Sequence, residues 1–160
     1  MLRRRSRLVA KTGLARRTPL RTSREKKTGR RDTGPDRATR ELVLERDEYR
    51  CVCCGKPVSD GPWSTQHRRA RGNGGTSRPE INRPSNLIIL CGSATSPGGC
   101  HLWCERRSTE AEDLGYVVSL NSKEDPADVP VHHWLYGLVY LRDDGGIRRV
   151  EPLGVASDES

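Results

Sequence analysis

The fold is decided by the stretch CVCCGKPVSDGPWSTQHRRA, residues 51–70, which joins a group of cysteines to a histidine followed by two arginines. Cys51 and Cys54 stand in a C-x-x-C turn, and a knuckle of this kind presents two thiolates to one Zn²⁺ ion. A strand is predicted over Trp63–Arg69, and it carries His67. The stretch therefore predicts a metal knuckle that leads into a strand with a histidine near its end.

The cysteines are expected to bind metal rather than to form disulfides. The N-terminus has charges but lacks the apolar segment of a signal peptide. No stretch reaches the ~18–20 apolar residues of a membrane span, so we expect a cytoplasmic protein with no membrane partner and with reduced thiols. The core is lean, with 32% hydrophobic residues and no Phe, and needs a staple such as zinc. The six cysteines are Cys51, Cys53, Cys54, Cys91, Cys100 and Cys104.

Four of these cysteines are predicted to be the ligands of a structural zinc. Cys91 and Cys100 form a second, looser pair across a glycine loop, and they complete the tetrahedron begun by Cys51 and Cys54. Cys104 follows Cys100 by one helical turn and is an alternative fourth ligand. A thioredoxin-type redox pair is the other interpretation of the C-x-x-C turn. It needs a helix directly after the cysteines, and Gly-Lys-Pro at residues 55–57 would break that helix.

The charge is concentrated at the start of the chain. Residues 1–40 contain 15 Lys and Arg against 3 Asp and Glu, a net of +12, whereas the whole chain has a net charge of +8. The remainder is therefore slightly acidic, at −4. Residues 1–37 are predicted to be a disordered basic arm that contacts nucleic-acid phosphates, since such a segment cannot bury enough apolar surface to order itself. A solvated tail that only aids solubility is the alternative.

The pattern of elements predicts an α+β fold with three parts. Residues 38–115 are expected to form the main domain, and residues 116–160 a C-terminal extension that ends in a β-hairpin. The apolar run at residues 86–91 fits a buried strand or one helical turn. The remaining expected elements are a helix over 38–50, a helix from Cys100 that ends with Gly115 at its C′ position, a strand over 116–120, and a hairpin that pairs Leu138–Leu141 with Ile147–Val150.

Three polar residues stand in separate motifs of the chain. The histidine in "QHRRARGNGG" is His67, the asparagine in "RPSNLIILCG" is Asn86, and the histidine in "GCHLWCERR" is His101. Their order resembles that of the HNH endonuclease family. The likeness runs from about Glu41 to Glu110, and is closest to the zinc-knuckle HNH proteins of tailed bacteriophages, often encoded near terminase genes. It implies a ββα-metal domain, in which a β-ribbon packs on a helix around one divalent cation.

The resemblance also implies a role for each site residue. His67 corresponds to the general base and His101 to a ligand of the catalytic ion, while Asn86 holds the loop of the ribbon through side-chain to backbone hydrogen bonds. Glu105 lies four residues after His101 on the same helix face and can reach the same ion. Gln66 departs from the family pattern, which commonly has Asp or His there as a metal ligand. Its amide oxygen can coordinate a hard cation, but without the charge of a carboxylate.

The resemblance therefore implies a metal-dependent endonuclease that hydrolyses DNA phosphodiester bonds, with Mg²⁺ or Mn²⁺ as the expected catalytic ion. A neutral imidazole can accept the proton of a water molecule at cellular pH. Arg68, Arg69, Arg71 and Arg106 are expected to contact DNA phosphates. One alternative, which Gln66 favours, is a non-catalytic zinc-knuckle module that binds nucleic acid. Another is an accessory packaging factor that docks on the large terminase subunit of a phage.

Overall fold

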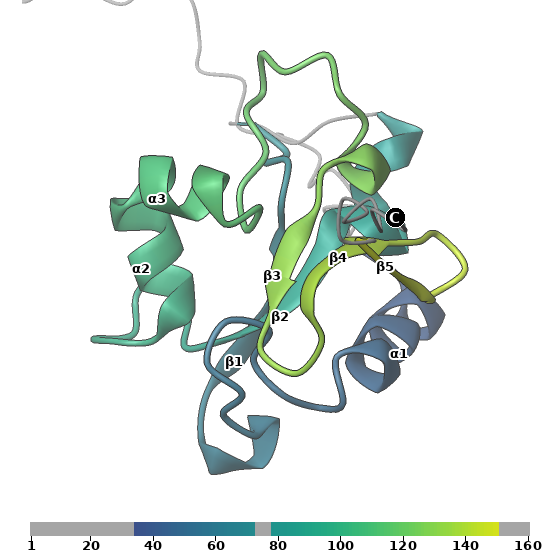
Figure 1. Cartoon of the computed structure of the whole chain (residues 1–160). Helices are drawn as coiled ribbons and strands as arrows, with labels where there is room; N and C mark the ends of the chain where they lie inside the picture. The colour runs from purple at the N-terminus through teal and green to yellow at the C-terminus, as the bar shows by residue number, and fades with distance from the viewer. Residues whose placement is uncertain (1–33, 73–77, 151–160) are drawn as a thin grey trace, which may run out of the picture. The chain divides into compact units, whose positions relative to one another are not determined.

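The computed structural model describes residues 34–72 and 78–150. The chain divides into two units, Met1–Asp32 and Thr33–Ser160, and every described residue belongs to the second. This part is a small mixed α+β structure with one two-stranded and one three-stranded sheet (Figure 1). Its helices are α1 (Arg37–Arg46), α2 (Cys100–Arg106) and α3 (Ser108–Asp113), with short 3-10 helices η1 (Val58–Asp60), η2 (Pro79–Asn82), η3 (Pro84–Asn86) and η4 (Pro126–Asp128). Its strands are β1 (Trp63–His67), β2 (Leu87–Cys91), β3 (Val131–His133), β4 (Gly137–Leu141) and β5 (Ile147–Arg149).

Helix α1 confirms the helix expected over residues 38–50, though it starts one residue earlier and ends at Arg46. The Asp36 side chain caps it by accepting a hydrogen bond of 2.7 Å from the backbone N–H of Thr39. Val43 and Leu44 are buried on its inner side. The cap and the two apolar residues together fix where the helix begins and which face it turns to the core.

Strands β1 and β2 form an antiparallel ribbon, in which Trp63 pairs with Cys91 and His67 pairs with Leu87. The apolar run at residues 86–91 is therefore a strand, not a helical turn. Successive side chains of a strand point to opposite faces. Accordingly Leu87 and Ile89 pack in a cluster with Val43 and Leu44 of α1. The other two apolar residues of β2, Ile88 and Leu90, pack in the larger cluster with Cys104 of α2 and Ala111 of α3. Figure 1 shows α1 on one side of the ribbon and α2 and α3 on the other.

The single helix predicted from Cys100 is wrong, because the helix is broken at Arg107, where φ is −122° and ψ is 55°. Neighbouring residues all tolerate a helix, so propensity gave no signal for the break. The end of the helix was predicted correctly: Gly115 follows the C-cap residue Leu114 with φ +74°. A Cβ at Gly115 would lie 1.9 Å from the backbone oxygen of Pro130, so this position also needs glycine for space.

The predicted strand over residues 116–120 is also wrong, since no strand is present there. Tyr116 and Val118 are buried, as expected for a strand, but the segment does not pair with a neighbouring strand to form a sheet. Its Val118 N–H donates to the backbone oxygen of Arg68, at the end of β1. The alternation of apolar residues in this segment therefore predicted correctly which side chains are buried, but it did not predict that the segment forms no strand.

The predicted C-terminal hairpin is confirmed, with Leu141 of β4 opposite Ile147 of β5. Strand β3 adds a third strand on the other edge of β4, with Val131 opposite Val139. Val131, Val139 and Leu141 are buried in the same cluster as Cys51 and Ile88. The segment expected to be an extension therefore shares its core with the knuckle and the ribbon. No described helix is both long and apolar enough to cross a membrane.

Candidate metal centre and histidine site

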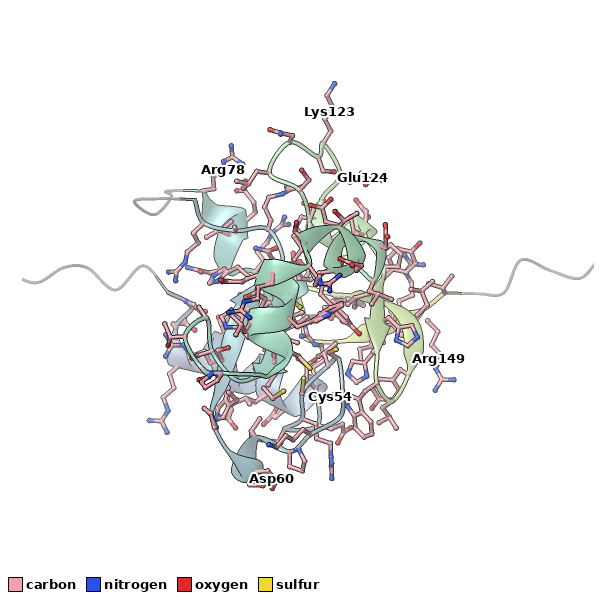
Figure 2. The ribbon with its side chains drawn as sticks, turned by 90° about the vertical axis from the view of Figure 1, so that its left-hand side faces the viewer. Cys54, Asp60, Arg78, Lys123, Glu124 and Arg149 are labelled. Atoms are coloured by element: carbon pink, nitrogen blue, oxygen red, sulfur yellow. The ribbon has the colours of Figure 1, made fainter. Side chains whose placement is uncertain are left out.

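Four cysteine side chains from three parts of the chain converge on one point. Their sulfur atoms all lie within 4.8 Å of one another, and Cys54 Sγ is 3.7 Å from Cys91 Sγ. Four thiolates at ~2.3 Å from a tetrahedral Zn²⁺ lie about 3.8 Å apart, so this donor set fits zinc. Figure 2 shows sulfur atoms gathered beside Cys54. The four cysteines are Cys51, Cys54, Cys91 and Cys100, the set predicted from the sequence, and they could hold a metal ion such as zinc.

Hydrogen bonds between the cysteine side chains of this cluster shift the pKa values of their thiols. The Cys100 thiol donates a hydrogen bond toward Cys51, and this contact lowers the pKa of Cys51 to about 5. The same contact raises the pKa of Cys100. Burial raises the pKa of Cys54 to about 11. The contacts of the cluster therefore favour the thiolate form of Cys51, and a bound cation would favour deprotonation of the other thiols.

Cys104, the alternative fourth ligand, is not part of the convergent set. It is buried in the larger hydrophobic cluster, where burial raises the pKa of its thiol to about 12. Cys53 packs against the same cluster and lies close to Cys100. Within residues 34–72 and 78–150, no other group of three or more His, Cys, Asp or Glu side chains converges in this way.

His67 is the last residue of β1, and its ring is half-buried. Its Nε2 atom lies 2.9 Å from the Oδ1 atom of Asn82, in the 3-10 helix η2. Burial lowers the pKa of His67 and the charge of Arg71 lowers it further, while the contact with Asn82 opposes both. The ring is therefore neutral at pH 7, which is the form that can accept a proton.

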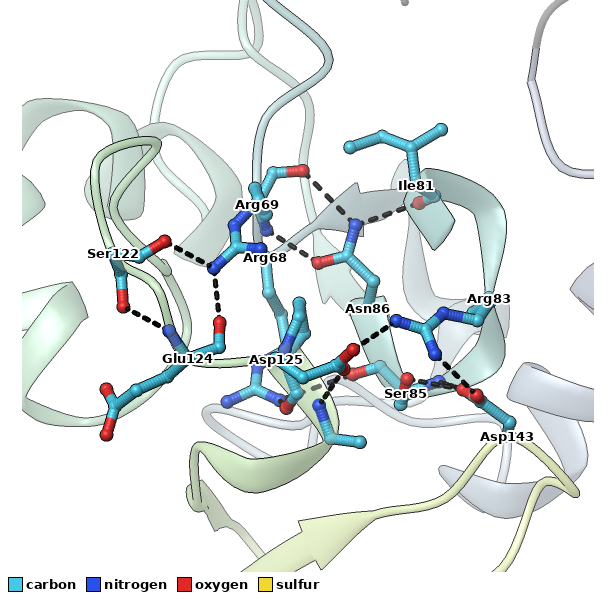
Figure 3. Close-up of polar contacts among 12 residues, drawn as sticks. Arg68, Arg69, Ile81, Arg83, Ser85, Asn86, Ser122, Glu124, Asp125 and Asp143 are labelled. Carbon is cyan, nitrogen blue, oxygen red and sulfur yellow. Dashed lines mark hydrogen bonds and ion pairs between the residues drawn. The ribbon is translucent and has the colours of Figure 1, made fainter. Parts of the chain in front are cut away.

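Asn86 makes the side-chain to backbone hydrogen bonds that were expected of it. Its Oδ1 accepts from the N–H of Arg69 at 2.7 Å, and its Nδ2 donates to the backbone oxygens of Ile81 at 2.8 Å and Arg69 at 3.2 Å (Figure 3). Asn86 is 1% exposed, so these bonds form in a dry environment. They join the segment after β1 to the segment before β2.

His101 and Glu105 lie together on α2, with His101 Nε2 3.8 Å from Glu105 Oε1. Two ligands of one divalent ion lie about 3–4 Å apart, so this pair can share an ion. Gln66 pairs with Ile88 in the ribbon, so its side chain points to the face on which α2 packs. His67, one residue on, belongs to the opposite face of the strand. The structure brings His101 and Glu105 into contact, and no contact of either with His67 is observed among the described residues.

The predicted phosphate contact by Arg68 is wrong, because this side chain is fully buried. Each of its five N–H donors meets a backbone oxygen, at distances from 2.7 to 3.3 Å. Burial lowers the pKa of Arg68, yet a guanidinium remains charged at neutral pH. The acceptors are the backbone oxygens of Ser85, Gly115, Pro126, Val129 and Pro130.

Arg69 is also buried, at 8% exposure, and its Nη2 donates to the backbone oxygens of Ser122 and Glu124 (Figure 3). The predicted contact of Arg69 with DNA phosphates is therefore wrong, because its charge is not exposed. Of the four arginines expected to contact DNA, Arg106 is exposed at the end of α2 and Arg71 is half-buried after β1. Only these two remain as phosphate-binding candidates.

Sequence reasoning missed Asn82 and the residues that surround it. Arg83 forms ion pairs with Asp125 and, at 3.1 Å, with Asp143, and Ser85 also binds Asp143 (Figure 3). Asp143 lies in the turn between β4 and β5. Nothing in the local sequence signals these contacts, because the partners are 42 to 60 residues apart in the chain.

Comparison of the chain with protein-family models, with curated proteins and with solved structures finds no match.

Proposed function

We propose that the protein is a metal-dependent endonuclease of the HNH type, which hydrolyses DNA phosphodiester bonds. The observation that carries the proposal is the neutral, half-buried His67 ring at the end of β1, directly after Gln66, whose side chain lies on the face of the ribbon that packs on the helix bearing His101 and Glu105. The HNH pattern that the sequence resembles has His67 and His101 in this order along the chain. Asn86, the third residue of that pattern, holds the two ends of the ribbon loop together.

The chemistry assigns a task to each residue. His67 accepts a proton from the attacking water, since its ring is neutral at cellular pH. His101 and Glu105 are the residues that would hold the catalytic ion, and Gln66 faces their side of the ribbon. A divalent ion at that position supplies charge stabilisation for the phosphate and the departing oxygen. Arg106 and Arg71 hold flanking phosphates, together with the basic arm.

The cysteine cluster is assigned a structural Zn²⁺ in this proposal. The four cysteine sulfurs would fill all four positions around a tetrahedral Zn²⁺, which would leave no position open for substrate. The cluster joins the knuckle to the end of β2 and to the first residue of α2. Zinc would thus fix the ribbon relative to the helix that carries His101.

A second candidate function is a zinc-knuckle protein that binds nucleic acid without cleaving it. It is favoured by Gln66, which supplies no negative charge, and by the pair of His101 and Glu105, which offers only two strong ligands. Binding to DNA with no cleavage would support it.

A plasmid-nicking assay with Mg²⁺ or Mn²⁺ tests the proposal. His67→Ala should lose ~10²–10⁴-fold in rate, because a general base contributes that much. Its affinity for DNA should stay within about twofold, because the arginines provide the binding. His132→Ala is the matched control, since His132 is an exposed histidine on β3. A wild-type protein that binds plasmid but nicks it with neither metal would replace the enzyme by the binding module.

A further inference from the structure

The contact of the His67 ring with Asn82 determines which ring nitrogen carries the hydrogen when the ring is neutral. Nε2 lies 2.9 Å from Oδ1 of Asn82, and an amide oxygen accepts hydrogen bonds but cannot donate them. Nε2 must then carry the ring hydrogen. Nδ1 keeps its lone pair and is the only ring atom able to accept a proton.

We infer that Asn82 is the positioning residue that fixes neutral His67 as the Nε2–H tautomer, which makes Nδ1 the atom that takes the proton from water. This inference rests on the proposed function for the reaction, although the tautomer itself does not. Asn82 touches neither DNA nor the ion in this assignment, and acts only through the ring of His67.

Asn82 is held firmly enough for this task. The residue before it, Ile81, is 3% exposed, and its backbone oxygen accepts from Asn86 Nδ2 at 2.8 Å. The residue after it, Arg83, is paired with Asp125 of one segment and Asp143 of another (Figure 3). Contacts on both sides therefore limit the freedom of the backbone that presents the Asn82 amide.

Asn82 is distinct from the asparagine of the HNH pattern. The amide of Asn86 binds the backbone of Ile81 and Arg69 through its oxygen and both of its N–H donors, and no contact of Asn86 with the His67 ring is observed among the described residues. The chain thus divides two tasks between two asparagines: Asn86 closes the loop, and Asn82 orients the base. A rotated Asn82 amide would present Nδ2 to the ring and demand the opposite tautomer, so the tautomer is the decisive observable.

The experiment is nuclear magnetic resonance of ¹⁵N-labelled, zinc-loaded protein at a pH where His67 is neutral, with the ring signals identified by their loss in His67→Ala. Wild type should show a protonated Nε2 and an unprotonated Nδ1. Asn82→Ala should relax to a mixture of both tautomers, and Asn82→Asp, which keeps an acceptor oxygen, should restore the wild-type pattern. Asn121→Ala, which alters an exposed asparagine in a loop, should change nothing.

Nicking by the same proteins shows whether the tautomer matters to the reaction. Asn82→Ala should lower kcat by about 10–100-fold with unchanged KM for plasmid, as for other residues that orient a functional histidine, and Asn82→Asp should recover most of the rate. A protonated Nδ1 in wild type, or an unchanged spectrum in folded Asn82→Ala, would overturn the inference. The expected spectrum in a protein that nicks nothing would support the tautomer and remove the proposed function instead.

Discussion

His67 lies in an environment that favours the uncharged ring. Burial is the largest cause of its lowered pKa, and the positive charge of Arg71 acts in the same direction. A base whose folded-state pKa is depressed stays unprotonated to a lower pH than the ordinary value of 6.5. In the proposed reaction, His67 would therefore remain able to accept a proton in mild acid.

The pH dependence of kcat/KM follows from that environment. Its acidic limb should have a midpoint below 6.5, since kcat/KM reports the free enzyme and protonation of His67 removes the base. Arg71→Gln removes a charge that lowers this pKa, so its midpoint should move upward. A wild-type midpoint above 6.5 would contradict the assignment of His67 as the base.

Arg68 is predicted to be a major contributor to stability. Arg68→Met would leave up to five buried backbone oxygens without a donor, at about 1–3 kcal/mol for each group left unsatisfied. We expect the free energy of unfolding in urea to fall by at least about 3 kcal/mol. Arg106→Met, at an exposed site, is the control and should unfold like wild type while binding DNA less tightly. Equal urea midpoints for both variants would show that the contacts of Arg68 contribute little.

At the scale of elements, the cysteine cluster connects the knuckle, strand β2 and helix α2. Wild type should carry about one tightly held zinc, because thiolate ligation contributes directly to folding. Cys91→Ser should lose that zinc and its cooperative thermal unfolding. Cys104→Ala should keep the zinc, since Cys104 lies outside the cluster. Metal analysis that finds zinc lost from Cys104→Ala and retained by Cys100→Ser would reverse the assignment of the fourth ligand.

Some elements were predictable because their signals are local. The C-x-x-C turn, the strand through His67, the hairpin around the DDGG turn and the glycine that ends α3 all follow from residues within a few positions of each other. Buried arginines were not predictable in this way. Arg68 and Arg69 stand in a basic run that indicates an exposed surface, and their acceptors come from residues up to 62 positions away. The role of Asn82 depends on a contact across 15 residues and has no motif.

At the scale of the whole molecule, charge and core are carried by different parts of the sequence. Residues 1–33 lie outside the described residues, and so does most of the predicted basic arm. In the described part of the chain, the core clusters consist of residues between Val43 and Ile147. We therefore expect the DNA affinity proposed for the arm and the stability of the fold to respond to different changes in the sequence.

Deletion of residues 1–33 should weaken DNA binding and leave folding intact. Each lost phosphate contact should reduce the slope of log affinity against log salt by ~0.9. Fluorescence anisotropy of labelled duplex DNA over a range of salt concentrations measures that slope, and thermal unfolding checks the fold. An unchanged slope would assign the arm to another partner. Loss of the folded state would show that the arm takes part in the core.

Strand β2 lies between two hydrophobic clusters and ends at a cysteine of the metal cluster. Its length therefore cannot vary. Inserting or deleting one residue between Asn86 and Cys91 would exchange the faces of every following side chain, because the period of a strand is two. The same change would turn Leu90 toward α1 and would turn Cys91 away from the other three cysteines of the metal cluster. The glycine-rich loop between Cys91 and Cys100 also connects two cysteines of the metal cluster, but its side chains do not alternate between two faces. Insertions and deletions during divergence should therefore accumulate in this loop.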